Sequence, residues 1–318
     1  MKTILVTGAA GFIGSHLSEK LLELGYRVVG VDNLDPYYDV KQKKCNLDLL
    51  KRNPNFVFCR QDIREPDGLA GLFQEYKPEF VAHLAAKAGV RASVENPRAY
   101  AEINVIGTIN LLELAVKHKV ANFVFASSSS VYGYRSKVPF REEEPVDKPI
   151  SPYAATKRSA ELLCYVYHHL YSLNVTCLRF FTVYGPRGRP DMAPYKFVKL
   201  ILEGKSITRF GDGTTKRDYT YITDIIAGLV AAIEKPLGYE IINLGNSAPV
   251  SLNEFITTIE RLTGKKAKIV ERPIPKGDVL VTYADIAKAK KLLGYQPRTK
   301  LEQGMKLFLE WFKQYHQI

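Results

Sequence analysis

The stretch VTGAAGFIGSHL, residues 6–17, places glycines at positions 8, 11 and 14. Residues 2–8 have the pattern of a buried β-strand, and residues 14–24 carry apolar side chains at helical spacing, so the glycines lie where a strand turns into a helix. Glycine allows the backbone to turn tightly and to approach a pyrophosphate, whose charge then meets the helix N-terminus. The stretch therefore predicts a dinucleotide-binding turn.

An acidic residue ends the next predicted strand, residues 27–32. Asp32 follows Gly14 by 18 residues. A carboxylate at this position accepts hydrogen bonds from the ribose hydroxyls of adenosine and repels a 2′-phosphate, which favours NAD over NADP. The alternative is that Asp32 only caps a turn beside Asn33. We predict NAD as the cofactor.

Strand and helix patterns alternate through the first half of the chain. Further strands are predicted over residues 55–62, 79–86, 122–128 and 174–180, and helices over residues 99–117 and 153–171. This alternation predicts an α/β fold built on a Rossmann-type doubly wound parallel sheet.

The pattern changes after residue 184. A loop rich in Pro, Gly and Arg, residues 185–194, leads to shorter elements with apparent strands at residues 240–245 and 266–272. We predict an NAD-binding Rossmann domain over residues 1–184, to which segments around 218–245 return. A smaller C-terminal α/β domain is predicted over residues 185–318.

The composition fits a soluble globular protein. Apolar residues make up 46% and charged residues 25% of the 318 residues, and no apolar run reaches the roughly 18 residues that span a bilayer. The N-terminal apolar run carries no small-residue cleavage site and is interrupted by glycines, so it reads as structure and not as a signal. The four cysteines show neither metal spacing nor a paired redox motif. We expect a cytoplasmic protein without a metal site.

The formal net charge of +12 raises the question of an anionic partner. Lysine-rich segments at residues 41–44, 265–268 and 287–291 are short, scattered and free of interleaved aromatic residues. They predict a solvated lysine-rich surface, with a contribution from an anionic small substrate as the alternative, and they disfavour nucleic acid.

A second motif carries candidate chemistry. SPYAATKRSAE, residues 151–161, places Tyr153 and Lys157 one helical turn apart on the same face. A nearby ammonium and the positive nicotinamide ring would favour the tyrosine phenolate, whose reference pKa is about 10, and bring it into the range of a working base. Between the two motifs, ASSSSVYGY (residues 126–134) ends a predicted strand in four serines, which alone could be a simple turn.

Taken together, these three motifs resemble the extended short-chain dehydrogenase/reductase family over essentially the whole chain. In that family a Ser or Thr four positions before the tyrosine of Val-Tyr-Gly assists proton transfer, and Ser128 stands four positions before Tyr132. The resemblance implies Ser128, Tyr153 and Lys157 as the catalytic set, and a nucleotide-sugar substrate held mainly by residues 185–318. It also implies a homodimer paired through residues 99–117 and 153–171.

The resemblance extends to binding residues. For NAD it implies, besides Tyr153 and Lys157, Gly8, Gly11, Phe12, Ile13, Gly14, Asp32, Asn33, Asp62, Ile63, Leu84, Ala85, Ala86, Lys87 and Asn104. For the nucleotide sugar it implies Arg91, Ser128, Ser129, Ser130, Thr182, Arg189, Arg217, Tyr219 and Asp278.

Two of these assignments have open alternatives, and one position departs from the pattern of the family. Asp62 could instead be the N-cap of the following helix, and Arg189 could be a surface arginine. UDP-galactose epimerases often carry an arginine three residues before the position of Asp278, where this chain has Pro275. We expect the diphosphate to be held differently here, through Lys276 or Arg189.

Ser129 and Ser130 distinguish among the reactions of the family. Its 4,6-dehydratases carry Asp-Glu at these two positions and its decarboxylases typically carry a Glu nearby, whereas serines do not titrate near neutral pH. Residues 179–193, RFFTVYGPRGRPDMA, closely resemble the UDP-glucuronate 4-epimerase group. Ser129, Ser130 and Thr182 would offer neutral hydrogen-bond donors to the C6 carboxylate of such a substrate.

We therefore expect an NAD-dependent isomerase that interconverts UDP-glucuronate and UDP-galacturonate. Transient oxidation at C4 gives a 4-keto intermediate, and the hydride returns to its opposite face. The nearest alternative is a UDP-glucose/UDP-galactose 4-epimerase, followed by a UDP-glucuronate decarboxylase or a nucleotide-sugar 4,6-dehydratase. A catalytically inactive NAD-binding scaffold is the non-enzymatic alternative.

Overall fold

The glycine-rich turn joins the first strand of the main sheet to the first helix. In the computed structural model, which describes residues 1–134, 137–275 and 278–318, β1 (Thr3–Thr7) leads through this turn into α1 (Phe12–Glu23). Gly8 has φ +72°, and a Cβ there would lie 2.9 Å from the amide nitrogen of Ala85. A Cβ on Gly14 would overlap the carbonyl oxygen of Gly8. Helix α1 can start this close to the strand only because both positions are glycine.

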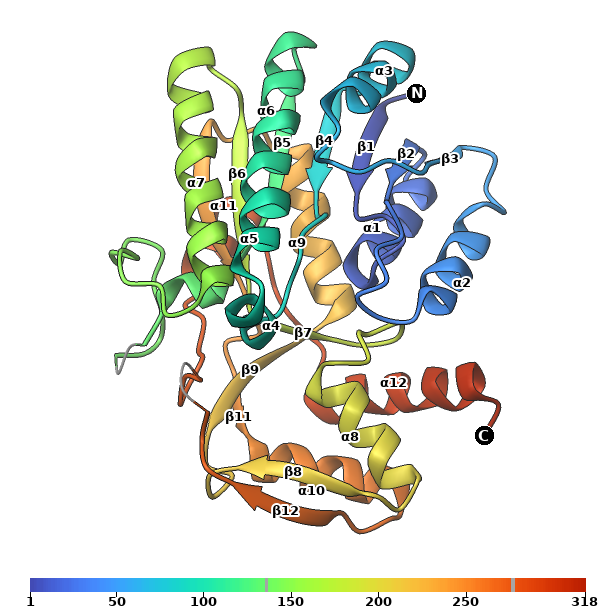
Figure 1. Ribbon diagram of the computed structural model, residues 1–318, viewed down its shortest axis with the longest axis vertical. Helices are drawn as coiled ribbons and strands as arrows, with labels where there is room; N and C mark the ends of the chain where they lie inside the picture. Colours follow the sequence, from blue (N-terminus) through green and yellow to red (C-terminus); the bar gives the residue numbers. More distant parts are fainter. Residues whose placement is uncertain (135–136, 276–277) are drawn as a thin grey trace.

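Seven parallel strands form the main sheet, in the order β10-β6-β5-β4-β1-β2-β3 (Figure 1). Besides β1 they are β2 (Arg27–Val31), β3 (Phe56–Cys59), β4 (Phe80–His83), β5 (Asn122–Ser128), β6 (Val175–Phe180) and β10 (Tyr239–Leu244). The predicted Rossmann-type α/β fold is confirmed. The strand order reverses beside β1, where ligands of such sheets bind at the carboxyl ends of the strands.

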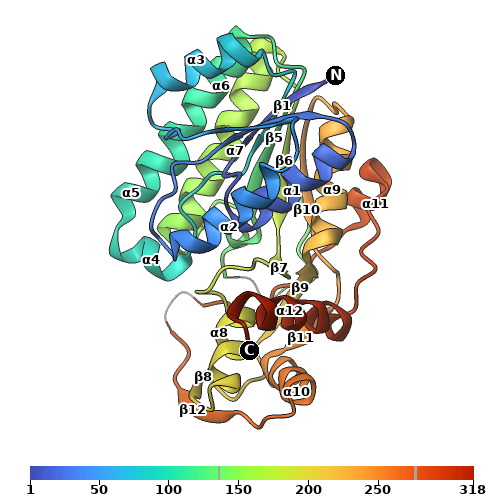
Figure 2. The ribbon, with the colours of Figure 1, turned by 90° about the vertical axis from the view of Figure 1, so that its right-hand side faces the viewer.

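Helices cover both faces of this sheet (Figures 1 and 2). One face is covered by α3 (Pro66–Tyr76), α6 (Gly107–Lys117) and α7 (Pro152–Tyr171), and the other by α1, α9 (Ile222–Glu234) and α11 (Ala287–Leu293), with α2 (Val40–Leu50) packed against α1. Successive side chains of β1 pack on opposite faces of the sheet. Leu5 belongs to one hydrophobic cluster, and Ile4 and Val6 belong to the other. All five residues of β1 are buried, which explains its continuous apolar run.

The helix predicted over residues 99–117 is interrupted by a wider turn. After α4 (Val90–Glu95), residues Pro97–Lys117 continue through α5 (Pro97–Ala101), a π-helical turn (Glu102–Ile106) and α6. Among the described residues this is the one helix long and apolar enough to cross a membrane, but 44% of its apolar window is buried inside the fold. Such a helix is equally typical of a protein core, and α6 contributes Leu111, Leu112 and Ala115 to the sheet-facing cluster.

The remaining elements form a lower lobe with two small sheets (Figure 1). One sheet has the order β11-β9-β7 and the other pairs β12 with β8. The strands are β7 (Thr182–Tyr184), β8 (Ser206–Phe210), β9 (Lys216–Tyr221), β11 (Pro249–Ser251) and β12 (Lys268–Arg272), and the helices are α8 (Ala193–Leu202), α10 (Leu252–Thr263) and α12 (Leu301–His316). Strand β10 lies in the main sheet although it follows the lobe strands β7, β8 and β9 in sequence. The domain limits 1–184 and 185–318 remain a prediction.

The loop between β7 and α8 is anchored to helices of the other lobe. Gln42 of α2 donates from Nε2 to the carbonyl oxygens of Arg187 and Gly188, at 2.7 and 3.0 Å. Nε2 of His16 in α1 lies 2.9 Å from the carbonyl oxygen of Pro186. Burial, with the nearby charge of Arg187, lowers the pKa of His16 to about 3, so the ring is neutral at physiological pH. These bonds hold the long loop that the sequence predicts over residues 185–194.

The turn between β1 and α1 generates a stability prediction. Gly14→Ala is expected to lower the free energy of unfolding by about 2 kcal/mol or more, because the new methyl group has no space beside the Gly8 carbonyl. Gly71→Ala is the matched control, since Gly71 lies in α3 and a Cβ there meets nothing within 4 Å. The control should be neutral or stabilising by up to about 1 kcal/mol. Urea unfolding of both variants measures the difference, and equal stabilities would contradict the prediction.

Candidate active site

One cavity joins the glycine-rich turn to the serine run. Its volume is about 410 Å³, and it opens over the carboxyl ends of β1, β2, β4 and β5. The predicted residues that line it are Gly8, Gly11, Phe12, Ile13, Gly14, Asp32, Asn33, Asp62, Ile63, Leu84, Ala85, Ala86, Lys87, Ser128, Ser129, Ser130, Tyr153, Lys157, Thr182 and Arg189. The two motifs that are far apart in sequence therefore face one space.

The first turn of α1 offers a cradle for a phosphate group. Gly11 precedes the helix, and no side chain caps the free N–H groups of the first turn. Gly11, Phe12 and Ile13 line the cavity at this point. Uncapped amides at a helix N-terminus bind anions. Because Gly8 and Gly11 have no side chains, a phosphate group can approach the main chain closely at this turn. These features fit the pyrophosphate of a dinucleotide.

Asp32 lies at the cavity wall with its carboxylate already bonded to the protein. Oδ2 accepts from the amide of Ala10 at 3.1 Å and Oδ1 from the amide of Leu34 at 2.8 Å. Nζ of Lys43 lies 3.8 Å from Oδ1, and both side chains are less than a tenth exposed. Asp32 thus forms the turn that the sequence left as an alternative, and each oxygen retains acceptor capacity for a ribose hydroxyl.

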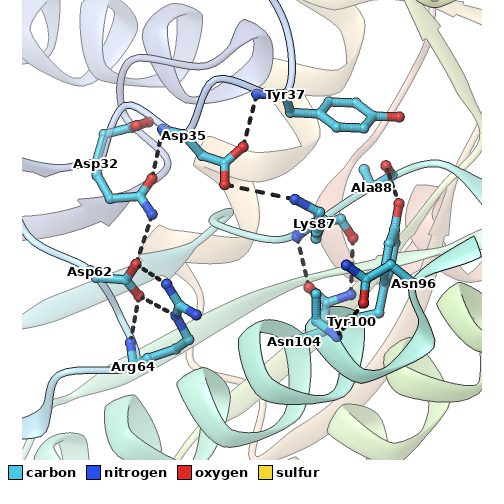
Figure 3. Close-up of polar contacts among 12 residues, drawn as sticks. Asp32, Asp35, Tyr37, Asp62, Arg64, Lys87, Ala88, Asn96, Tyr100 and Asn104 are labelled. Atoms are coloured by element: carbon cyan, nitrogen blue, oxygen red, sulfur yellow. Dashed lines mark hydrogen bonds and ion pairs between the residues drawn. The ribbon is translucent and has the colours of Figure 1, made fainter. Parts of the chain in front are cut away.

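Polar contacts fix the neighbouring loops around the same end of the cavity (Figure 3). Asp62 accepts from Asn33 at 2.8 Å and from Nε and Nη2 of Arg64 at 3.0 and 2.8 Å. Hydrogen bonding from Arg64 is the main cause that lowers the pKa of Asp62 to about 2. Helix α3 has Glu65 as its N-cap, so Asp62 does not have the alternative role of helix cap.

Lys87 connects two of these loops. Its ammonium lies 3.7 Å from Asp35, and its backbone exchanges hydrogen bonds of 2.8 and 3.0 Å with the side chain of Asn104 (Figure 3). Asn104 is 2% exposed and does not line the cavity. Its contact with the cavity wall is indirect, through the backbone of residue 87.

The four serines divide into different environments. In a strand, successive side chains point to opposite sides. Ser127 turns into the protein and donates to Glu161 at 2.6 Å, whereas Ser128 lines the cavity together with Tyr153 and donates to Oγ of Ser130 at 3.0 Å. Ser128 also accepts from the amide of Ser130 at 3.2 Å and caps a short 3-10 helix, Ser129–Tyr132. The run is therefore both a turn and a set of hydroxyls at the cavity.

Tyr153 and Lys157 project from the first turns of α7 into the cavity wall. Burial raises the pKa of Tyr153, while the hydrogen bond with Ser128 and the charge of Arg189 lower it. Burial lowers the pKa of Lys157 to about 8. Nζ of Lys157 donates to the carbonyl oxygen of Ala126 at 2.7 Å and lies 4.8 Å from the centre of the Phe125 ring. The direct effect of Lys157 on the tyrosine remains a prediction.

Arg189 lies against the aromatic ring of Tyr37, which also lines the cavity. It forms two bonds to Asp191, at 3.0 and 2.6 Å, and its guanidinium lies 5.4 Å from the centre of the Tyr37 ring. Its side chain is 20% exposed. Arg189 is thus part of the cavity wall, which distinguishes it from the surface arginine of the alternative interpretation.

A separate group of predicted residues lies outside the cavity lining. Arg91 forms an ion pair of 2.8 Å with Asp278, and their fields act on Arg217, whose pKa is lowered mainly by burial. Tyr219 is 4% exposed and stacks on Phe255 with ring centres 4.5 Å apart. None of these four residues is among those that line the cavity with the serines, and their substrate roles remain predictions. Lys276 lies outside the described residues.

Sequence reasoning missed several cavity residues, among them two adjacent tyrosines and a buried lysine. Tyr37 and Tyr38 follow Asp32 within a few positions, and two adjacent aromatics after the acidic strand end were the available signal. Lys43 was assigned to a solvated lysine cluster, which is wrong for this residue because it is 7% exposed and pairs with Asp32. Helical spacing in residues 40–50 would have placed Lys43 on the buried face with Leu47 and Leu50.

Comparison with known proteins gives concordant matches. The family model described as GDP-mannose 4,6 dehydratase matches residues 5–308. A UDP-glucuronate 4-epimerase of Thermodesulfobacterium geofontis is 53% identical over 311 residues, which cover 98% of this chain and 96% of that protein. The likeness thus spans both lobes and all the motifs above.

Two solved structures share the fold closely. The UDP-glucuronic acid 4-epimerase of Bacillus cereus, in complex with UDP-glucuronic acid and NAD, matches with a TM-score of 0.93 and 42% identity, over 98% of this chain and 99% of the other. The UDP-glucose 4-epimerase of Thermotoga maritima, with UDP-glucose, matches with a TM-score of 0.91 and 38% identity over 99% of each chain.

Proposed function

The chain belongs to the extended short-chain dehydrogenase/reductase family, in the group described by the GDP-mannose 4,6 dehydratase model, and we propose that it is an NAD-dependent UDP-glucuronate 4-epimerase. It interconverts UDP-glucuronate and UDP-galacturonate. The observation that carries this proposal is the pair Ser129 and Ser130, which lines the cavity next to Tyr153 where a dehydratase would carry acids. The relatives from Thermodesulfobacterium geofontis and Bacillus cereus support the same substrate.

The cavity fits NAD at one end and a sugar at the other. The uncapped first turn of α1 would hold the pyrophosphate, and Asp32 would accept from the adenosine ribose. Bound NAD supplies reversible hydride acceptance at C4 of the sugar. Tyr153 takes the proton of the C4 hydroxyl, and the hydrogen bond from Ser128 stabilises the phenolate that results. Since the hydride returns to the ring, no net oxidation occurs.

The C6 group of the sugar would be held by neutral donors. Ser129, Ser130 and Thr182 all line the cavity. They donate to a carboxylate without titrating themselves, so they provide no acid or base for elimination at C6. The UDP-glucose 4-epimerase of Thermotoga maritima, at 38% identity, keeps UDP-glucose as the second candidate substrate.

Product analysis tests the proposed reaction. The protein is incubated separately with UDP-glucuronate and UDP-glucose, and the products are resolved by NMR. We expect UDP-galacturonate from the first substrate and little turnover of the second. Tyr153→Phe should lower kcat by about 10²–10⁴-fold while NAD stays bound, because only proton transfer is removed. A pentose or 4-keto-6-deoxy product, or a preference for UDP-glucose, would contradict the proposal.

The serine pair is tested by removing its hydroxyls. Ser129→Ala and Ser130→Ala should each weaken binding of UDP-glucuronate, because a hydrogen bond to a charged group contributes about 1.5–3 kcal/mol. The KM for UDP-glucuronate should rise roughly tenfold or more, and decarboxylated product should increase, while any turnover of UDP-glucose is unchanged. If uronate binding and the product ratio both stay as in the wild type, the serines do not hold the carboxylate.

We also propose a cytoplasmic homodimer paired through α6 and α7. Helix α7 exposes apolar side chains at helical spacing, with Leu162 50%, Tyr165 49%, Val166 42% and Leu170 61% exposed. A contiguous apolar stripe on an exposed helix supports pairing with a second copy. The four cysteines are free, which is compatible with a reducing compartment. Sedimentation equilibrium at the mass of a single 35.8 kDa chain would refute the dimer.

A further inference from the structure

Behind the serine run lies a fully buried ion pair. Glu161 of α7 is 0% exposed and Arg179 of β6 is 1% exposed. Nε and Nη2 of Arg179 donate to the two carboxylate oxygens of Glu161, at 2.8 and 2.9 Å. A third donor, Nη1 of Arg158, reaches the same carboxylate at 3.0 Å from a side chain that is 27% exposed. Charges are buried at this depth only when they are paired and bonded in this way.

The carboxylate also binds the strand that carries the catalytic hydroxyl. Ser127 donates to Oε1 of Glu161 at 2.6 Å, and Ser127 lies directly opposite Arg179 in the pairing of β5 with β6. Glu161 therefore joins one helix to two neighbouring strands at their carboxyl ends. Ser128 is the next residue of β5, and strand alternation places its side chain on the other side, where it lines the cavity together with Tyr153.

The same helix face carries the other two members of the catalytic set. Tyr153, Lys157 and Glu161 are spaced by four residues along α7, so they follow one another on one side of the helix. Lys157 bonds the carbonyl oxygen of Ala126, one residue before Ser127. Two consecutive residues of β5, Ala126 and Ser127, are thus bonded to α7 immediately before Ser128.

We propose that Glu161 is a positioning residue for the reaction. By holding Ser127 and Arg179, its carboxylate fixes α7 against β5 and sets the distance between the Ser128 hydroxyl and the Tyr153 phenol. Glu161 is fully buried and is not among the residues that line the cavity. The inference rests on the proposed function for its kinetic consequence, but the contacts on which it is based do not depend on which sugar is bound.

The negative charge of Glu161 also acts on the pKa of Lys157. The groups that act on the Lys157 ammonium are Cys164 and Glu161 from α7, Cys177 from β6, His83 from β4 and the Phe125 ring from β5. Burial lowers the pKa of His83 to about 3, so its ring is neutral. A thiol acts as a negative group only when ionised, and burial raises the pKa of Cys177. The one carboxylate in this set, Glu161, therefore favours protonated Lys157, which opposes the effect of burial.

Two substitutions separate the positioning effect of the Glu161 carboxylate from the effect of its charge on Lys157. Ser127→Ala removes the bond to β5 but leaves the carboxylate charged, so kcat for UDP-glucuronate should fall about tenfold with KM and bound NAD unchanged. The alkaline limb of its pH profile should not move. Glu161→Gln removes the charge as well, and the unpaired Arg179 then adds to the lowering of the Lys157 pKa. The alkaline limb of the pH profile of Glu161→Gln should move about one pH unit toward lower pH. Its kcat should also fall further than that of Ser127→Ala.

The readouts also separate this inference from the proposed function. The Lys157 pKa is followed in NAD-loaded protein without any sugar, from the ¹³Cε resonance that disappears in Lys157→Met. Arg158→Gln is the control, because it removes an outer partner of the same carboxylate and should not lower the Lys157 pKa. A wild-type enzyme inactive on UDP-glucuronate would refute the function and leave the titration informative.

Two results would overturn the positioning role. One is a wild-type kcat in Ser127→Ala. This result also decides whether Glu161 has a positioning role if the Glu161→Gln variant does not fold. The other is an unchanged Lys157 titration in folded Glu161→Gln. A loss of thermal stability with neither kinetic nor titration change would mean that the ion pair serves only the stability of the fold.

Discussion

The close approach of α1 to β1 is the constraint on which the rest of the cavity depends. Gly14 lies against the carbonyl of Gly8, so the helix starts at the carboxyl edge of the sheet with its free amides directed into the cavity. Every other wall is built relative to that edge. Asp32 directly follows β2 and Asp62 lies three residues after the end of β3 on one side, and Ser128 ends β5 on the other. The switch in strand order beside β1 opens the space between them.

The catalytic side of the cavity depends on the alternation of a single strand. One serine of β5 faces the buried Glu161 and the next faces Tyr153. A run of identical residues therefore supplies both the anchor and the proposed catalytic hydroxyl, because the side-chain period of a strand is two. The following serines leave the strand and continue along the cavity in a 3-10 helix.

The parts of this arrangement that sequence reasoning could reach are those with a fixed local spacing. The glycine turn, the tyrosine–lysine pair and the parallel sheet follow from periodicities of two and about four residues. The ion pair between Glu161 and Arg179, the burial of Lys43 beside Asp32 and the pairing of Arg91 with Asp278 join residues separated by 11 to 187 positions. Nothing local in the chain identifies such partners. Helical spacing can place Lys43 on the buried face of its helix, but it does not show that Asp32 lies beside it.

The anchoring of the β7–α8 loop bears on how this scaffold can be altered. The loop that carries Arg189 is held by Gln42 and His16, which belong to helices on the dinucleotide side of the molecule. The walls that we propose for the sugar and for the dinucleotide are therefore not independent modules. A loop grafted from a relative with another sugar preference would bring its own side chains but not the helix residues that bond its backbone carbonyls. Residues 16 and 42 would therefore have to be exchanged together with the loop. Divergence of sugar preference in such a scaffold is constrained by His16 and Gln42, although neither side chain is among the residues that line the cavity.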